Sequence, residues 1–305
     1  MIKNKNSENI EIIKEAYSIL ERGYAFQKCT ALLQCSDLDG VSEEEYKKLD
    51  YKLKAIRQDF AKILVIMNSI DKTYSAYQKN EYSNTYYSFV DDQATSELGC
   101  FIEYLFAKYR GILEYIQQIL EICIPPRFDK KEKKEYDNQK KGYEKYNFLL
   151  QYIKNNIEKD NNILNIKWFQ QLRMERNFII HEGATCLVFG DKKNLLFEVM
   201  TLDALDKDDK KNQDMFFTNN NGLVYYSYYW GLQISKLVIF IETIFKFLLK
   251  NSSITEEKKW ICEKLLVKNE FIDEDGVKLP DIQDVLGNLL RSIIEKKKTN
   301  PYYLG

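Results

Sequence analysis

The sequence predicts an all-α protein, a helical bundle with N- and C-terminal helical extensions and one small β-hairpin insertion. Long stretches place apolar residues at intervals of three and four, which is the period of an amphipathic helix. Four prolines and twelve glycines among 305 residues favour long helices over a sandwich of many short strands. One pair of short segments has the composition of strands instead, and it predicts the hairpin.

Three helices are expected before the first proline pair. Residues 8–35 carry one apolar stripe, which Gly23 weakens near its middle. A Ser-x-x-Glu capping box starts a second helix over 42–78. A polar, tyrosine-rich loop over 80–92 leads to a third helix over 93–124, which the proline pair ends.

Residues 130–146 form the most basic region of the chain. Lysines interleaved with tyrosines suit a track for single-stranded RNA, because the cations bind phosphates and the rings stack on bases. The same pattern suits a solvated helix face with ion pairs between residues four apart. Both interpretations stay open, and Lys140 and Lys141 are the candidate substrate-binding residues of the first.

The remainder is expected to be mainly helical. Its exceptions are a hairpin with strands predicted over 185–189 and 194–202, a polar, acidic loop over 203–214 and a turn over 219–222. The helix expected over 224–250 is apolar on most sides, so it should lie at the centre of the bundle or at an interface. Further helices are expected over residues 148–157, 163–182, 254–267 and 281–297.

The helix over 163–182 carries the only histidine of the chain, His181, just before a glycine that is expected to end the helix. Arg173, Asn177 and His181 follow one another at intervals of four and therefore share a face. A guanidinium, an amide and an imidazole in a row are candidates for a functional site. A histidine in this place also suits an ordinary helix end, where it interacts with the last carbonyls and the helix dipole.

The string Arg176-Asn177-Phe178-Ile179-Ile180-His181 resembles the R-x(4–6)-H motif of the HEPN superfamily, in which Asn, Asp or His is favoured after the arginine. That superfamily includes ribonuclease toxins, abortive-infection proteins and ribonuclease domains of CRISPR effectors. The resemblance implies a HEPN-like helical core over 41–250 with the hairpin inserted at about 185–202, an N-terminal helical segment over 1–40 and a C-terminal helical extension over 251–305. It also implies a metal-independent endoribonuclease that leaves 2′,3′-cyclic phosphate and 5′-hydroxyl ends, in phage defence or as a toxin.

The residue types suit this chemistry. The ribose 2′-hydroxyl is the nucleophile, so the protein has to transfer protons and stabilise the charge of the phosphorane. His181 suits the proton transfer because the pKa of an imidazole lies near the operating pH. Arg176 suits the phosphate, since a guanidinium stays charged and offers two donors to two oxygens. Asn177 is expected to orient the substrate or the partner motif, and Arg173 to make a secondary phosphate contact; no metal or cofactor is required.

One geometric condition has to be met. On a regular helix, Arg176 and His181 diverge by about 140°. They converge if the helix unwinds before Gly183, or if residues from two chains meet across a two-fold axis. The resemblance implies the second arrangement, a homodimer with a composite active site, because HEPN ribonucleases build one cleft from two motifs. The alternative function is a non-catalytic HEPN-like module that binds nucleotide, RNA or another protein.

Composition limits the remaining possibilities. The net charge is −1, so RNA would have to be bound by a local basic patch rather than by a global field. The six cysteines contain no CxxC pair, which argues against a zinc site. The sequence shows no signal peptide and no apolar run long enough to cross a bilayer, so a cytoplasmic protein is expected. RNA, a second copy of the chain, and an antitoxin or other defence-system protein are the candidate partners.

Overall fold

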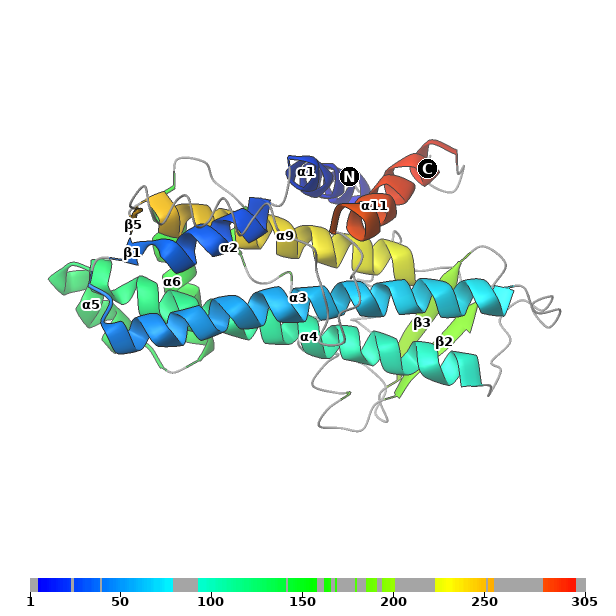
Figure 1. The fold of residues 1–305 in the computed structure, drawn as a ribbon, viewed down its shortest axis with the longest axis horizontal. Helices are drawn as coiled ribbons and strands as arrows, with labels where there is room; N and C mark the ends of the chain where they lie inside the picture. The colour runs from blue at the N-terminus through cyan, green and yellow to red at the C-terminus, as the bar shows by residue number, and fades with distance from the viewer. Residues whose placement is uncertain are drawn as a thin grey trace.

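A computed structural model describes most of the chain, and helices that lie side by side in an elongated bundle account for most of the residues it describes (Figure 1). The predicted all-α class with a small sheet is therefore confirmed, while the likeness to HEPN folds and the three-part division of the chain stay predictions. The described residues are 5–22, 25–38, 40–78, 93–140, 142–157, 162–165, 168, 179, 185–190, 194–200, 223–250, 252–254 and 282–299.

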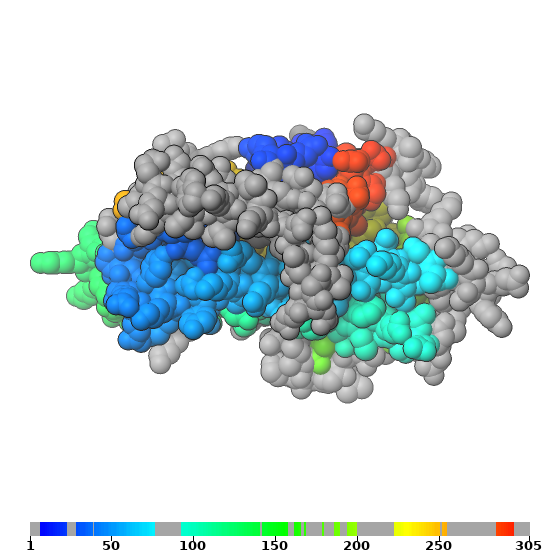
Figure 2. Space-filling model, viewed as in Figure 1, coloured from blue at the N-terminus to red at the C-terminus, as the bar shows by residue number. Residues whose placement is uncertain are grey.

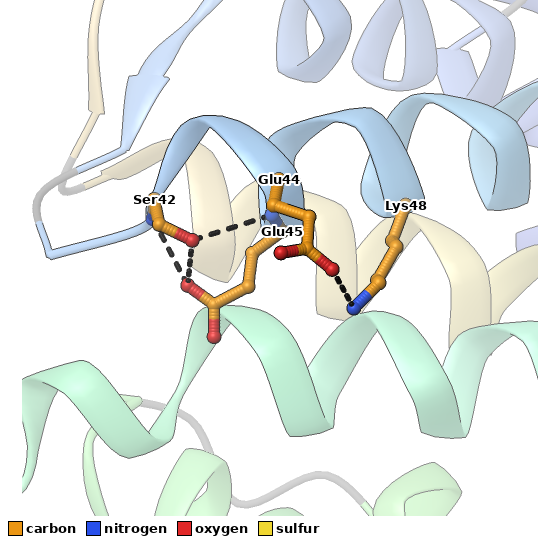
Figure 3. Close-up of polar contacts among 4 residues, drawn as sticks. All are labelled: Ser42, Glu44, Glu45 and Lys48. Atoms are coloured by element: carbon orange, nitrogen blue, oxygen red, sulfur yellow. Dashed lines mark hydrogen bonds and ion pairs between the residues drawn. The ribbon is translucent and has the colours of Figure 1, made fainter.

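Two long antiparallel helices, α3 (Glu43–Gln78) and α4 (Gln93–Cys123), form one layer of the bundle (Figure 1). Their bounds confirm the predicted second and third helices. The capping box at the start of α3 is also confirmed: the Glu45 backbone N–H donates to Ser42 Oγ at 3.3 Å, and the Ser42 backbone N–H donates to Glu45 Oε2 at 2.9 Å (Figure 3). An ion pair of 2.8 Å between Glu44 and Lys48 lies beside it.

Helix α9 (Tyr226–Lys250) is the central element, which is one of the two places that the sequence predicted for it. Most of its side chains are buried, and Trp230 is the largest fully buried side chain among the described residues. The Trp230 ring packs against two rings of α4, with centroid distances of 4.8 Å to Phe106 and 6.0 Å to Tyr109. Aromatic packing of this kind joins α9 to the α3–α4 layer.

Helices α1 (Lys5–Glu21), α2 (Ala25–Cys35) and α11 (Ile282–Thr299) pack against α9. The expectation of one helix over 8–35 is wrong, because two helices occupy this stretch. Helix α1 ends at Glu21, two residues before the predicted weak point at Gly23. Figure 2 shows α1 and α11 side by side along one edge of the molecule, where Arg291 Nη2 donates to Tyr17 Oη at 2.9 Å.

One end of the bundle is formed by α5 (Lys130–Asp137) and α6 (Tyr143–Asn155), which follow the 3-10 turn η2 (Pro125–Arg127). A two-stranded ladder of β1 (Asp37–Leu38) and β5 (Ser252–Ser253) joins segments from opposite halves of the chain there. Arg127 Nη2 donates to the Leu248 carbonyl at 3.2 Å and so satisfies an acceptor in the last turn of α9. The sequence did not predict the β1–β5 ladder.

At the other end, β2 (Thr185–Gly190) and β3 (Leu195–Met200) form the predicted hairpin, and β4 (Val224–Tyr225) adds a third strand that the sequence assigned to the following helix. Helix α4 covers the outer edge of β2. The Cys186 backbone N–H donates to Glu103 Oε1 at 2.9 Å, and a Cβ on Gly99 would lie 2.9 Å from the Cys186 carbonyl oxygen. A glycine is therefore needed where the helix closes this strand edge.

Candidate functional site

The predicted catalytic residues Arg176, Asn177 and His181 lie outside the described residues, as do Arg173 and Lys141. Their assignment stays a prediction. The predicted loop over 80–92 and residues 255–267 of the predicted helix over 254–267 also lie outside the described part of the chain. In and around the segment that carries the motif, the structure describes one short turn and two single residues. These are the 3-10 turn η3 (Asn162–Leu164), Trp168 and Ile179.

Trp168 connects this segment to α9. Its indole Nε1–H donates to the Ile163 carbonyl at 2.9 Å, so the ring is held against a turn whose two apolar side chains, Ile163 and Leu164, are buried. The indole ring forms a T-shaped pair with that of Phe240 in α9, with a centroid distance of 5.9 Å and an interplanar angle of 78°. The Lys236 ammonium lies over the same ring, 5.8 Å from its centroid. Trp168, eight residues before Arg176, is therefore seated on the central helix.

Ile179, inside the motif, is helical and half-buried and packs against the hydrophobic core. On the helix that the sequence predicts, Asn177 and His181 stand two residues to either side of it, each about 160° around the helix axis from Ile179. A helix with Ile179 facing inward is thus expected to turn the amide and the imidazole away from the interior. This direction is an expectation, since neither side chain belongs to the described residues.

The basic region contains the one predicted substrate-binding residue that the structure describes, Lys140. Its side chain is exposed, and its backbone N–H donates to Glu144 Oε2 at 3.0 Å. Two of the four lysines of α5 make ion pairs four residues apart, with Lys131 3.9 Å from Glu135 and Lys133 3.3 Å from Asp137. These are the pairs that the solvated-face interpretation expects.

The tyrosines of this region do not form an exposed row. Tyr136 and Tyr146 are buried in the hydrophobic core, and Tyr143 is 38% exposed. Burial raises the pKa of Tyr136 to about 12, so its phenol stays neutral, with the Lys145 ammonium 4.6 Å from its ring centroid. Two of the three rings are therefore engaged within the fold rather than open for stacking on bases.

The structure also places a buried carboxylate between α3 and α4 that sequence reasoning missed. Asp59 is 5% exposed and lies 3.0 Å from Lys108 Nζ and 3.6 Å from Lys62 Nζ. Burial lowers the pKa of Lys108, but the hydrogen bond and charge of Asp59 outweigh it and raise that pKa above its ordinary value. The signal was present in the sequence, because Asp59 stands between Ile56 and Phe60 in an otherwise apolar stripe.

A row of polar groups is buried on one face of α9. Tyr226, Trp230 and Gln233 are spaced four and three residues apart, and within the described part of the chain Tyr226 Oη, Trp230 Nε1 and Gln233 Oε1 have no hydrogen-bond partner. The neighbouring Tyr109 hydroxyl does have one, since it donates to the Gln233 backbone carbonyl at 2.8 Å. Burial raises the pKa of Tyr226 far above its ordinary value, so this row offers neutral hydrogen-bonding groups rather than charge.

Among the described residues, no group of three His, Cys, Asp or Glu side chains is arranged to hold a metal ion. None of the helices in the same ranges is both long and apolar enough to cross a membrane. Comparison with known proteins found no matching family model, no matching curated protein and no matching solved structure.

Proposed function

We propose that the protein is a metal-independent endoribonuclease of the HEPN type, with phage defence or toxin activity as its biological role. The observation that carries the proposal is the string from Arg176 to His181, which uses the only histidine of the chain and has the favoured asparagine after its arginine. The helical context supports it, because long helices precede and follow the motif and Trp168 and Ile179 pack against the bundle interior.

The proposed reaction uses the ribose 2′-hydroxyl as the nucleophile. His181 transfers a proton, and Arg176 stabilises the negative charge that develops on the phosphorane; a positioned cation of this kind is usually the larger contribution to catalysis. The 2′-oxygen bonds to phosphorus, the bond to the 5′-oxygen breaks, and the products are a 2′,3′-cyclic phosphate and a 5′-hydroxyl. Asn177 orients the substrate or the second motif, and Arg173 makes a further phosphate contact.

We further propose that two chains form the active site together. One imidazole per chain leaves a monomer without a separate acid and base, and a two-fold arrangement brings a second motif to the same phosphodiester. The exposed Lys140 and its neighbour Lys141 are the proposed contacts for RNA outside the catalytic residues. Partners in the cell would then be RNA, a second copy of the chain, and an antitoxin or other defence-system protein.

The test is incubation of the wild type, Arg176→Ala and His181→Ala with mixed RNA in EDTA, followed by analysis of the new ends. The expected result is cleavage by the wild type with cyclic-phosphate and 5′-hydroxyl ends, and loss of at least about a hundredfold in rate for either variant. RNA binding without cleavage by the wild type would favour the non-catalytic binding module instead. Unchanged cleavage by His181→Ala would remove that residue from the chemistry, and light scattering that finds only a monomer would rule out the two-chain site.

A further inference from the structure

We propose that the outward face of α5 and the turn after it bind the phosphate backbone of a nucleic acid strand through three unpaired lysines, Lys130, Lys134 and Lys140. The inference rests on the proposed function and extends it from the reacting phosphate to the rest of the RNA strand, but its test does not require cleavage. Helix α5 lies at one end of the elongated bundle, and the green end that includes it projects to the left in Figure 2.

This end of the molecule carries the local positive charge that a nearly neutral chain needs in order to bind a polyanion. Residues 127–145 contain eight basic and five acidic residues, which leaves three positive charges, whereas the whole chain carries −1. A positive surface attracts phosphates and releases the counterions condensed around them, whatever the base sequence. The charge of this end is therefore complementary to a phosphate backbone.

The described lysines of this region fall into two groups. Lys131 and Lys133 are paired with carboxylates one turn away, and Lys145 lies over the Tyr136 ring, 4.6 Å from its centroid. The others are exposed and make no ion pair with any residue that the structure describes: Lys130, Lys134 and Lys140. These three ammonium groups can bind a phosphate without breaking an ion pair within the protein.

Helix α5 places two of these lysines on one side. Lys130 and Lys134 are four residues apart, so they share a face and lie about 6 Å apart along the helix axis. That distance is close to the separation of neighbouring phosphates on one strand. Tyr136 is the buried side chain of α5 and stands about 120° and 160° around the axis from the two lysines, so both face away from the bundle.

Local contacts fix α5 relative to the rest of this end. The Glu132 backbone N–H donates to Asp129 Oδ1 at 2.7 Å, and the Asp129 backbone N–H donates to Glu132 Oε2 at 2.9 Å, which completes a capping box. The Tyr136 ring packs against Phe128 and Phe148, with centroid distances of 5.4 and 5.8 Å. The Asp129 carboxylate also occupies the helix N-terminus, so the lysine side chains rather than the helix amides are the binding groups.

The contacts at this surface are expected to be to phosphates rather than to bases. Stacking on bases requires open rings, whereas Tyr136 and Tyr146 are buried. An ammonium binds phosphate as a point charge and does not offer the paired donors that distinguish one base from another. Strands of different sequence should therefore bind with similar affinity.

The experiment removes the same number of charges from the same helix in two ways. Lys130→Gln with Lys134→Gln removes the unpaired lysines of α5, and Lys131→Gln with Lys133→Gln is the matched control that removes the paired ones. Each protein is titrated at several salt concentrations with a labelled 2′-O-methyl RNA about 12 nucleotides long. This probe keeps the phosphates but lacks the 2′-hydroxyl nucleophile, so it is bound without being cut.

The wild type is expected to bind the probe with a slope of about −2 or steeper in the logarithm of affinity against that of salt concentration, because each phosphate contact on a single strand contributes about 0.7. The variant without Lys130 and Lys134 should lose about tenfold or more in affinity at low salt and about 1.4 units of slope, and Lys140→Gln should lose about 0.7 units. The control variant should lose less than about threefold in affinity. Equal losses in the two double variants overturn the assignment to the unpaired lysines.

Two further probes test the chemistry of the partner. Oligouridylate and oligoadenylate versions of the probe should bind within about threefold of each other, and a larger difference overturns contact through phosphates alone. Vesicles that contain phosphatidylserine test an anionic membrane as the partner. Vesicle binding that is lost with Lys130 and Lys134, beside a wild type that does not bind the probe, overturns the nucleic acid surface.

Failure of this inference is distinguishable from failure of the proposed function. If the wild type cuts RNA in EDTA but the variant without Lys130 and Lys134 binds the probe as the wild type does, only the α5 surface is overturned. If the wild type cuts no RNA but binds the probe with the expected loss in that variant, the ribonuclease proposal fails and the nucleic acid surface is supported.

Discussion

Around Trp230, helices α4 and α9 meet through buried rings, whereas α5 and the start of α3 carry caps and ion pairs in solvent. Trp230 is fully buried and touches Phe106, Tyr109 and Tyr229. In α5, the Asp129 carboxylate caps the helix, and lysines pair with carboxylates one turn away. Burial of a large ring stabilises a fold by several kcal/mol, while an exposed ion pair contributes less than about 1 kcal/mol. The exposed lysines can therefore be changed to test binding without unfolding the protein.

The largest effect on stability is expected from Trp230→Ala. Truncation leaves a cavity between α4 and α9, and such changes cost about 3 to 5 kcal/mol. Urea unfolding followed by circular dichroism measures the loss. Tyr51→Ala is the control, because Tyr51 is 71% exposed and its removal should change the free energy of unfolding by less than about 0.5 kcal/mol. Equal effects of the two variants would contradict the central place of Trp230.

The interior should also make the protein sensitive to alkali. Burial raises the pKa of the Cys123 thiol from 9.0 to about 12 and that of Tyr136 from 10.0 to about 12. Both groups are neutral in the folded protein, so their contribution is complete below the unfolded pKa and is lost as pH rises through the folded one. The free energy of unfolding should fall between about pH 9 and 12, and Cys123→Ala should show a shallower fall. A constant free energy over this range would contradict the prediction.

The ion pair between α3 and α4 is expected to contribute less to the free energy of unfolding than a buried ring and more than an exposed ion pair. Among the described residues, Lys108→Met leaves the buried Asp59 with Lys62 alone, at 3.6 Å, and should cost about 1 to 2 kcal/mol. Addition of Asp59→Asn should restore part of this loss, because no uncompensated charge then stays buried. Lys47→Met is the matched control, since Lys47 pairs with Glu43 in solvent. A double variant less stable than Lys108→Met alone would contradict this account.

A smaller effect is expected at the capping box of α3. Ser42→Ala removes the oxygen that accepts from the Glu45 backbone and should cost about 1 kcal/mol. The hydrogen bonds from Ser42 hold the pKa of Glu45 below its ordinary value, so their contribution is present above the unfolded pKa and is lost as pH falls through the folded one. The difference between wild type and variant, measured by urea unfolding, should therefore shrink in acid. A difference that grows in acid would contradict the assigned role.

The smallest effect on stability is expected for Lys140→Ala, because this side chain is exposed. If Lys140 contacts a phosphate, however, RNA affinity should fall and the slope of its logarithm against that of salt concentration should drop by about one unit. Fluorescence anisotropy with a labelled single-stranded RNA at several salt concentrations measures both. Lys131→Ala is the control, because that lysine already pairs with Glu135. The same affinity for wild type and Lys140→Ala would remove Lys140 from the RNA-binding surface.

Periodicity predicted the long elements well. The capping box and the proline pair set the bounds of α3 and α4, and the apolar surface of α9 indicated its central place. Short elements were missed, because β1, β4 and β5 each have two residues and owe their pairing to distant segments. Asp59 was missed for a similar reason: its two lysines come from two helices, and only the fold brings Lys108 to it.

The candidate site was predictable only as a pattern. The sole histidine and the spacing from Arg176 mark it in the sequence, but neither the convergence of the two groups nor a second chain follows from spacing on one helix. The contacts of Trp168 could not be predicted at all, since Phe240 and Lys236 lie about 70 residues later and meet it through tertiary packing.

The packing of α1 and α2 against α9 has a consequence for synthesis on the ribosome. Their apolar stripes leave the ribosome before α9 does, and the α9 surface that covers them is translated roughly 200 residues later. At ordinary elongation rates the delay is about 10 to 40 s, during which the apolar faces of the two helices stay exposed and can bind chaperones or neighbouring nascent chains. Arrest of translation before α9 would leave a fragment prone to aggregate, whereas release just beyond it would allow the N-terminal helices to dock.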